Sequence, residues 1–307
     1  MRYAVLMAVV LCAEMARAVP LPEDTNAIKT LTVEQARGLA ETFPGVRADG
    51  LNDCLPLNGL KRLDADVARA LARYDKGPLL LNGLTSIGAD SVKPLAEFQD
   101  ILALSGLTTL DVDAAKALAN TPAWNGQLPQ LTSLDAETAT ALAEFKGPFL
   151  TLGGLTAVDA DTARALAEFE GKVLYLNGLT KLDARTARAL AGFKGSWMTL
   201  NGLTTLDAET AQALAACSKW TGRLPRLTAL ESPDAVATAR ALAARPGRLR
   251  LTGLKRVSPK TLAALIEKRD VDIPLIETLE FIREPDGSTT EDFVIPEWLE
   301  DRQRRAR

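Results

Sequence analysis

A repeat of about 24 residues constrains the fold of this chain more than any other feature. A leucine recurs along most of the sequence at intervals of 22 to 27 residues, and in most repeats it directly follows a glycine. These positions are Leu60, Leu84, Leu107, Leu131, Leu155, Leu179, Leu203, Leu227 and Leu254, and Ile276 fits as a degenerate tenth. A fixed period of this length is typical of architectures in which one small unit is stacked many times.

Each repeat has two halves with different hydrophobic periods. The first half, as in Leu79-Leu-Leu-Asn-Gly-Leu84, alternates as a short strand with one buried face does. The second half, as in Asp183 to Phe193, has apolar residues at helical spacing behind an aspartate suited to the N-cap. Glycines follow the helices, where a left-handed C-terminal residue is expected, at Gly77, Gly147, Gly171 and Gly195.

One strand and one helix cannot bury their own apolar faces, but stacked copies can. The units therefore predict an α/β fold, a curved solenoid of about ten units. Parallel strands lie about 4.8 Å apart on its concave face, and short helices lie on its convex face, because helices need more width than strands. A parallel β-helix is the competing fold. Its three β-branched strands per coil do not match the alanine-rich second half of each unit.

The pattern resembles the leucine-rich repeat family, in the short form found in secreted bacterial proteins. The resemblance covers about residues 55–276, near 70% of the chain. Where that family carries a buried asparagine, this chain has a leucine, as at Leu84 and Leu179, so the family's asparagine ladder should be absent. The asparagines that the chain does have are expected on the open side of the strands, at Asn58, Asn82, Asn177 and Asn201.

The segments outside the repeats predict an export signal and two caps. Residues 1–18 have a basic start at Arg2, an apolar run and Ala16-Arg17-Ala18, which is typical of a signal peptide cleaved near Ala18 and predicts a secreted or periplasmic protein. An apolar N-terminal capping segment is the alternative. Residues 19–54 read as an N-terminal cap, 55–276 as the solenoid, and 277–307 as a C-terminal hairpin cap and tail. The hairpin pairs Thr278 to Arg283 with Thr290 to Ile295 around Asp286-Gly287.

Composition argues against most catalytic chemistry. The chain has no histidine, which excludes histidine-based triads and histidine-ligated zinc. A net charge of -3 gives no basic field for nucleic acid, and no apolar run is long enough to span a membrane. We find no phosphate loop, no catalytic carboxylate pair and no nucleophile–base pair. The sequence therefore predicts a non-enzymatic protein–protein interaction scaffold without metal or cofactor. The alternative is a secreted carbohydrate-binding or carbohydrate-processing protein.

Several residue types allow two readings. The aspartate column around Asp183 reads as helix caps or as calcium ligands. Cys54 and Cys217 read as buried thiols rather than a disulfide, because about seven units separate them. Trp124 and Trp220 read as filling gaps beside small glycines or as platforms for sugars. The tail, Arg302 to Arg307, reads as a solvated terminus or as a contact for an anionic surface.

The outward columns of the strands are the predicted binding site. The first runs Pro56, Leu80, Ala103, Gln127, Thr151, Tyr175, Thr199, Arg223 and Arg250, and the second Asn58, Asn82, Ser105, Pro129, Gly153, Asn177, Asn201, Pro225 and Thr252. Neither column, as written, holds an acidic residue. Arg223 and Arg250 should be adjacent, so an anionic partner would relieve their repulsion. The predicted site is Tyr175, Thr199, Arg223, Arg226 and Arg250, for an acidic protein segment or an anionic glycan. A solvated basic patch is the alternative.

Overall fold

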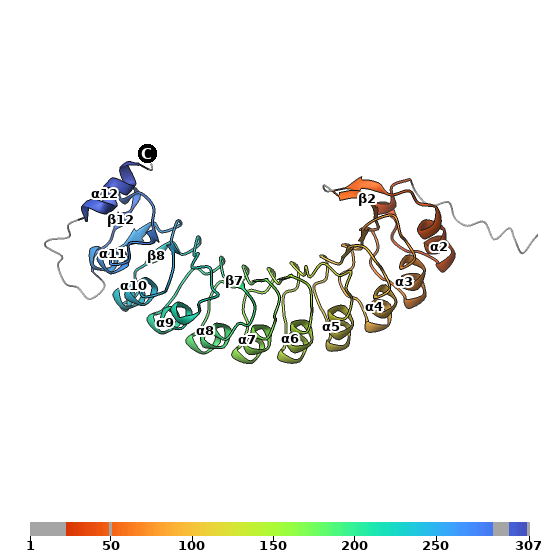
Figure 1. Ribbon diagram of the computed structural model, residues 1–307, viewed down its shortest axis with the longest axis horizontal. Coiled ribbons are helices and arrows are strands. Elements are labelled where there is room, and N and C mark those ends of the chain that lie inside the picture. Colours follow the sequence, from red (N-terminus) through yellow and green to blue (C-terminus); the bar gives the residue numbers. More distant parts are fainter. Residues whose placement is uncertain (1–22, 49–50, 285–294, 306–307) are drawn as a thin grey trace, which may run out of the picture. The chain divides into compact units, whose positions relative to one another are not determined.

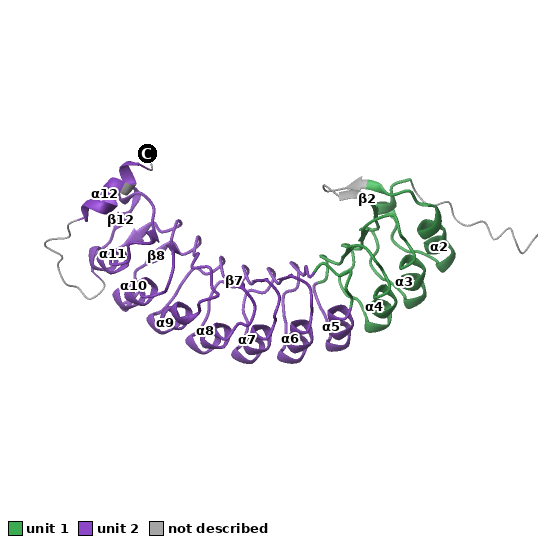
Figure 2. Ribbon diagram, in the orientation of Figure 1, with its two compact units in different colours: residues 1–107, 121–125 green, residues 108–120, 126–307 purple. Residues whose placement is uncertain are grey.

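The computed structural model describes residues 23–48, 51–284 and 295–305. The chain divides into two compact units, with residues 1–107 and 121–125 in unit 1 and residues 108–120 and 126–307 in unit 2 (Figure 2). Both are built from leucine-rich-repeat-like segments in which one short strand precedes one short helix (Figure 1). None of the described helices is both long and apolar enough to cross a bilayer.

Unit 1 carries four strands in one sheet and three α-helices that pack side by side. Its sheet order is β1-β2-β3-β4, with β1 antiparallel to β2 and the other pairs parallel. Residues 19–54, expected as a cap, contain a helix and the β1–β2 hairpin. The elements are η1 (Thr25–Ala27), α2 (Val33–Thr42), β1 (Val46–Ala48), β2 (Leu51–Pro56), α3 (Ala65–Leu71), β3 (Leu79–Leu80), α4 (Ala89–Leu95) and β4 (Leu102–Ala103).

Unit 2 carries its strands on the concave side of a row of helices (Figure 2). Its helices are α5 (Val112–Ala119), α6 (Ala136–Ala143), α7 (Ala160–Ala167), α8 (Ala184–Ala191), α9 (Ala208–Ala216), α10 (Ala235–Ala243), α11 (Pro259–Ile266), η2 (Ile276–Thr278) and α12 (Glu297–Arg304). Its strands are β5 (Phe149–Thr151), β6 (Val173–Tyr175), β7 (Trp197–Thr199), β8 (Ala229–Leu230), β9 (Leu249–Arg250), β10 (Arg256–Val257), β11 (Val271–Asp272) and β12 (Glu280–Phe281). All strand pairs of this unit are parallel.

The repeated leucines form the core, as the period predicts. All nine anchor leucines are buried, and Leu179 and Leu203 are fully so. The degenerate tenth position differs, because Ile276 lies in η2 and stays half-exposed. The tenth repeat does contribute a strand, since Val271 in β11 pairs with Leu249 in β9.

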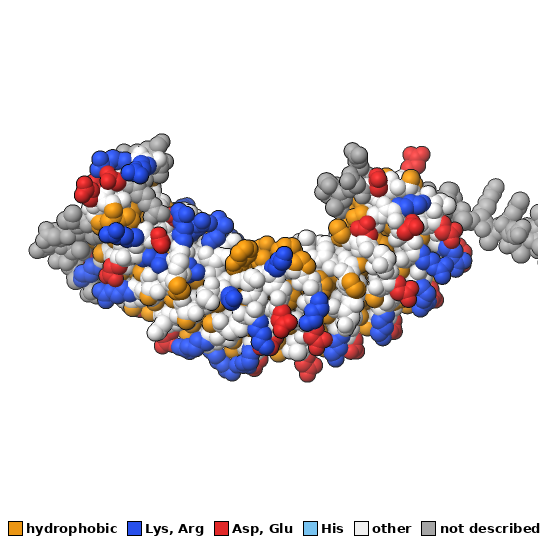
Figure 3. Space-filling model, in the orientation of Figure 1, with side chains coloured by type: hydrophobic (Ala, Val, Ile, Leu, Met, Phe, Trp, Pro, Cys, Tyr) orange, Lys and Arg blue, Asp and Glu red, His pale blue; other side chains and the backbone are white. Residues whose placement is uncertain are grey.

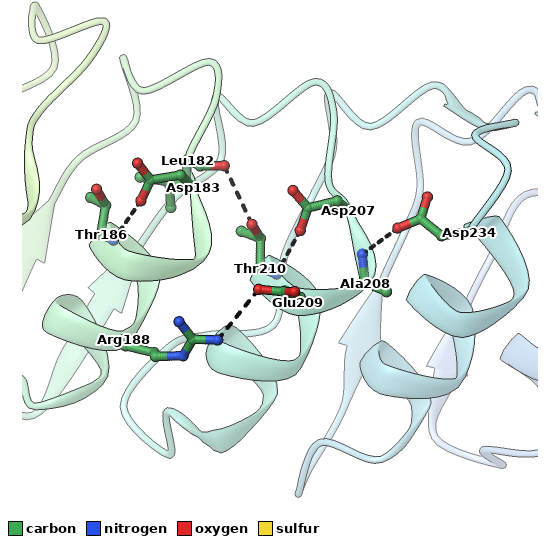
Figure 4. A network of polar contacts seen from close by, with 9 residues as sticks. All are labelled: Leu182, Asp183, Thr186, Arg188, Asp207, Ala208, Glu209, Thr210 and Asp234. Carbon is green, nitrogen blue, oxygen red and sulfur yellow. Dashed lines mark hydrogen bonds and ion pairs between the residues drawn. The ribbon is translucent and has the colours of Figure 1, made fainter.

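Aspartates cap the helices of their own repeats, and threonines link one repeat to the one before it (Figure 4). The predicted aspartate column has six members. The capping interpretation is confirmed at five of them, which accept the backbone N–H of the third helical residue: Asp111, Asp135, Asp159, Asp183 and Asp207. The sixth, Asp64, stands at the N-cap of α3 but its side chain makes no capping hydrogen bond. In α6 to α9 the residue at that third position is a buried threonine, and its side chain lies toward the preceding repeat. Thr210 Oγ1, for example, donates to the carbonyl of Leu182 in the preceding repeat at 3.5 Å.

The asparagine column corrects the sequence-based expectation. These side chains do not simply face solvent: Asn58 Oδ1 accepts the N–H of Asn82 at 3.0 Å, and Asn177 Oδ1 accepts that of Asn201 at 3.0 Å. A ladder of asparagines therefore exists, at a different position from the one the family pattern suggested. The ladder stops where the next repeat has a proline at the equivalent position, because Pro225 has no N–H to donate. Asn201 Oδ1 is accordingly buried without a hydrogen-bond partner.

The glycines after the helices also have a different role from the predicted one. Of those four glycines, Gly77 has a positive φ, whereas Gly147, Gly171 and Gly195 do not. A Cβ atom on Gly171 would stand 2.2 Å from the ring of Phe169, and one on Gly195 would stand 2.4 Å from the ring of Phe193. Glycine is needed there because a phenylalanine two residues earlier packs against its backbone.

The longest interval between repeats holds a turn and a second line of strands. The predicted extra residues around Asp234 form a turn before α10, and Asp234 Oδ2 accepts the N–H of Ala208 in α9 (Figure 4). Strand β8 precedes this turn and pairs through β10 with β12. Strand β12 falls in the first arm of the predicted C-terminal hairpin. The turn and most of the second arm of that hairpin, like the predicted signal peptide, lie outside the described residues.

Candidate binding face on the strand side of unit 2

The predicted site residues lie on the strand side of unit 2. Tyr175 and Thr199 are in register on β6 and β7, and both are partly exposed. Arg223 and Arg250 form a parallel bridge, so the predicted adjacency of these two arginines is confirmed. Arg226 is exposed and follows Pro225 in the same repeat as Arg223. The structure therefore brings all five residues to one side of one unit.

An aspartate changes the electrostatics of this side. The outward column continues past Arg250 to Asp272 on β11, so the expectation of a column without acidic residues is wrong. Asp272 carboxylate oxygens lie 2.6 Å from Arg248 Nε and 3.4 Å from Arg250 Nε. This hydrogen bond and the negative charge raise the pKa of the Arg248 guanidinium. The repulsion that was expected to call for a partner at Arg250 is thus relieved within the chain.

The remaining arginines divide into paired and unpaired groups. Arg256 reaches Glu231 at 2.9 Å and Glu280 at 3.4 Å. Arg223 and Arg226 make no ion pair with any carboxylate of the described residues. Two guanidinium groups of the predicted site therefore remain open to an external anion.

An aromatic column that the sequence analysis did not single out lies beside the predicted one. Phe149, Val173 and Trp197 are in register on β5, β6 and β7, two residues before Thr151, Tyr175 and Thr199. Phe149 is 43% exposed and Trp197 63% exposed, although Leu150 and Met198 next to them are fully buried. Figure 3 shows hydrophobic side chains gathered on this side, above α6 to α8. The sequence does contain a signal for this column. The strand alternation, continued two residues toward the N-terminus from Thr151, Tyr175 and Thr199, gives one more outward position in each strand.

A bulge separates the aromatic column from the arginines. Trp220 takes a core position opposite Met198, and Gly222 follows it with a φ of 69°. Arg245 fixes this bulge: its guanidinium lies 5.2 Å from the Trp220 ring centroid and donates to the Trp220 and Arg248 carbonyls, each at 2.6 Å. Burial lowers the pKa of Arg245. A buried cation therefore positions the loop that carries Arg223.

The outward column is not open along its whole length. In unit 1, Pro56, Leu80 and Ala103 are buried, and Leu80 and Ala103 form a cluster with Cys54. The expectation that this column is free of the core is wrong for unit 1. In unit 2 it holds, because Gln127, Thr151, Tyr175, Thr199, Arg223 and Arg250 are all exposed or partly exposed.

The other two-sided readings have clear outcomes. Trp124 and Trp220 are 2% and 1% exposed, which confirms that they fill the core and leaves no ring face for a sugar. Cys54 and Cys217 are buried thiols and not halves of a disulfide. Within the described ranges, no three acidic or cysteine side chains come together as a metal site would require.

Stacked repeats of one short strand and one short helix define a fold of the leucine-rich-repeat type. Its strand side is aromatic and cationic in unit 2. Among solved structures, the chain is similar to TLR13 in its complex with the single-stranded RNA ssRNA13, with 17% identity over 71% of this chain and a TM-score of 0.41. This chain spans about a third of the length of that chain, 33%. It is also similar to a leucine-rich repeat protein of Leptospira interrogans, with 14% identity, 83% of each chain covered and a TM-score of 0.33. No family model and no curated protein matches the sequence.

Proposed function

We propose that this chain is a non-catalytic scaffold that binds a partner protein on the strand side of unit 2. The observation that carries the proposal is Trp197, which is 63% exposed at the edge of a regular parallel sheet. The fold does not need an aromatic side chain there, since the core is complete beneath it. Exposed apolar patches of this kind mark interaction sites on soluble proteins. Tryptophan, tyrosine and arginine are the residues most enriched where interfaces hold their binding energy.

Nothing specific favours the carbohydrate alternative. Its tryptophans, Trp124 and Trp220, are buried, and the carboxamide oxygen of Asn177 is already engaged by the Asn201 N–H. The exposed guanidinium groups of Arg223 and Arg226 can pair with the carboxylates of a protein, which neutral sugar hydroxyl groups do not offer.

Export of the chain is part of the proposal and rests on the sequence alone. The expected mature protein begins near Val19 and acts in the periplasm or outside the cell. The intact mass of protein recovered from those compartments measures the cleavage site. A mass that retains residues 1–18 would contradict export by this route.

Site-specific photo-crosslinking tests the binding face. A benzoylphenylalanine at position 199 faces outward from β7, and Thr199 Oγ1 makes no hydrogen bond that the exchange would lose. The matched control places the same group at Gln212, which is exposed on α9 of the same repeat. We expect a protein to be crosslinked from position 199 and not from position 212 in cells that express the full chain. Crosslinking only from position 212, or from neither, would refute the proposed face.

A further inference from the structure

The chemistry of the binding face indicates the class of partner, provided that the proposed function holds. Its apolar half spans three consecutive strands. Val173 lies on the same side of the sheet as Phe149 and Trp197 but is only 6% exposed. We attribute its burial to the two aromatic side chains in register on either side. Phe149 and Trp197 therefore form the exposed part of one apolar surface, with Val173 buried between them.

The cationic half begins one repeat further along the chain. Arg223 and Arg226 are both exposed, and neither pairs with a carboxylate of the described residues. Arg248, Arg250 and Arg256 are different, because each forms an ion pair: Arg248 and Arg250 share Asp272, and Arg256 pairs with Glu231 and Glu280. Two guanidinium groups without a carboxylate partner among the described residues thus lie one repeat beyond the apolar surface.

The distance between the two halves sets a spacing in the partner. Parallel strands lie about 4.8 Å apart, so the repeat of Arg223 lies about 10 Å from β6, at the middle of the aromatic column. An extended peptide advances about 3.3 Å per residue. Arg223 also stands two residues further along its strand than the aromatic column, and alternate side chains of an extended peptide face the same side. An apolar side chain over β6 and a carboxylate at Arg223 are therefore about four residues apart in a segment that crosses the strands.

We propose that this face binds an extended acidic protein segment in which an apolar side chain precedes or follows a carboxylate by about four residues. The apolar side chain packs on Phe149, Val173 and Trp197, and the carboxylate pairs with Arg223 or Arg226. Single-stranded nucleic acid also combines stacking with charge, but it needs a groove of cations that follows its backbone. Two unpaired arginines in a chain of net charge -3 do not provide one.

Synthetic peptides test this inference without the native partner. The probe is a fluorescein-labelled peptide of about 12 residues of glycine and serine, with one phenylalanine and glutamates two and four positions after it. Two comparison peptides replace the glutamates by glutamines or the phenylalanine by serine. We expect the full chain to bind the probe in an anisotropy titration at low salt. Each comparison peptide should bind about tenfold more weakly or worse, the loss expected when one buried aromatic ring or one charge-assisted contact is removed.

Variants of the protein assign the two halves. Trp197→Ala should weaken binding of the probe about tenfold and leave the serine comparison peptide unaffected. Arg223→Glu/Arg226→Glu should weaken binding of the probe and leave the glutamine comparison peptide unaffected. Phe281→Ala and Arg240→Glu are the matched controls, because they change an aromatic residue and an arginine that are also exposed but belong to β12 and α10. Both control variants should bind the probe as the wild type does.

Three results would overturn the inference. One is equal binding of all three peptides, and a second is loss of binding in the control variants. The third is tighter binding of an oligouridylate or of heparin that depends on Trp197 and Arg223, which would assign the face to another class of ligand. The proposed function fails separately: a protein crosslinked from position 199 through a segment without this pattern leaves the scaffold intact and refutes only the partner class.

Discussion

Asn177 and Asn201 occupy equivalent positions in neighbouring repeats but have different partners. The side-chain oxygen of Asn177 accepts the Asn201 N–H at 3.0 Å, whereas that of Asn201 is buried opposite Pro225 and accepts nothing. The identity of one residue in the following repeat decides whether the same side chain stabilises the stack. The pattern of a single repeat does not reveal this pairing, because it depends on the N–H that the next repeat donates.

The first prediction compares these two asparagines. Asn177→Ala leaves the Asn201 N–H without its acceptor and should lower the free energy of unfolding by about 1–3 kcal/mol. Asn201→Ala removes an unpaired oxygen and should change it by close to zero. Urea denaturation of both variants measures the difference. Equal losses would show that the ladder contributes nothing.

The second prediction concerns acid. Hydrogen bonds from the Thr186 backbone and side chain lower the pKa of Asp183. A carboxyl whose pKa is lower in the folded state stabilises the fold fully above its ordinary pKa of about 3.9, and this contribution is lost as the pH falls through the folded-state pKa. Asp183→Ala should therefore cost about 1 kcal/mol near pH 7 and much less near pH 2. Urea midpoints at the two pH values measure this, and a cost that is independent of pH would contradict it.

Among the elements, the period, the order of strand and helix, and the buried leucines could be predicted because each recurs within a single repeat. The departures arise where a residue depends on another repeat. Asp272 neutralises Arg250 from the next strand, and the aromatic column becomes visible only when three strands are aligned. The bulge at Trp220 likewise depends on Arg245, which comes from the following repeat and takes the column occupied elsewhere by phenylalanine.

The third prediction tests the bulge. Gly222 has a φ of 69°, and a Cβ atom there would stand 2.5 Å from the Arg248 carbonyl oxygen and from Arg245 Nη1. Gly222→Ala should lower the free energy of unfolding by about 1–2 kcal/mol or more. Gly153→Ala is the control, because no atom lies within 4 Å of its Cβ position, and it should have little effect. Thermal denaturation distinguishes the two, and equal melting temperatures would show that the bulge adapts freely.

The fourth prediction tests the leucine columns. Leu179→Ala and Leu203→Ala each empty a fully buried position and should cost about 2–5 kcal/mol in urea denaturation. Lys181→Ala changes an exposed neighbour and should stay within about 0.5 kcal/mol of the wild type. Leucine variants as stable as the lysine variant would mean that the buried and open faces of the strands have been exchanged.

For the molecule as a whole, stability should be distributed from neighbour to neighbour, because most contacts join consecutive repeats. The last described helix shows how such a stack is closed. In α12, Leu299 is buried, and the Gln303 side chain accepts the Ile276 N–H and donates to the Pro274 carbonyl.

The fifth prediction is that damage to this closure stays local. Leu299→Ala should speed amide hydrogen exchange in residues 271–284 and in α11, while β5, β6 and β7 exchange as in the wild type. Hydrogen–deuterium exchange with mass spectrometry resolves these segments. A uniform increase along unit 2 would instead indicate one cooperative transition for the whole unit.

The two tryptophan bulges also bear on how such a chain can change over generations. Trp124 with Gly126 and Trp220 with Gly222 lie 96 residues apart, and the two glycines have φ values of 71° and 69°. Unequal recombination between the two gene segments that encode these bulges would remove or duplicate four whole repeats. The order of strands and helices would stay the same. At the new junction, the residue that meets the bulge glycine would change only between Phe145 and Arg245. The architecture thus permits inheritable changes in length in whole blocks, and with them changes in how many strands a ligand can cross.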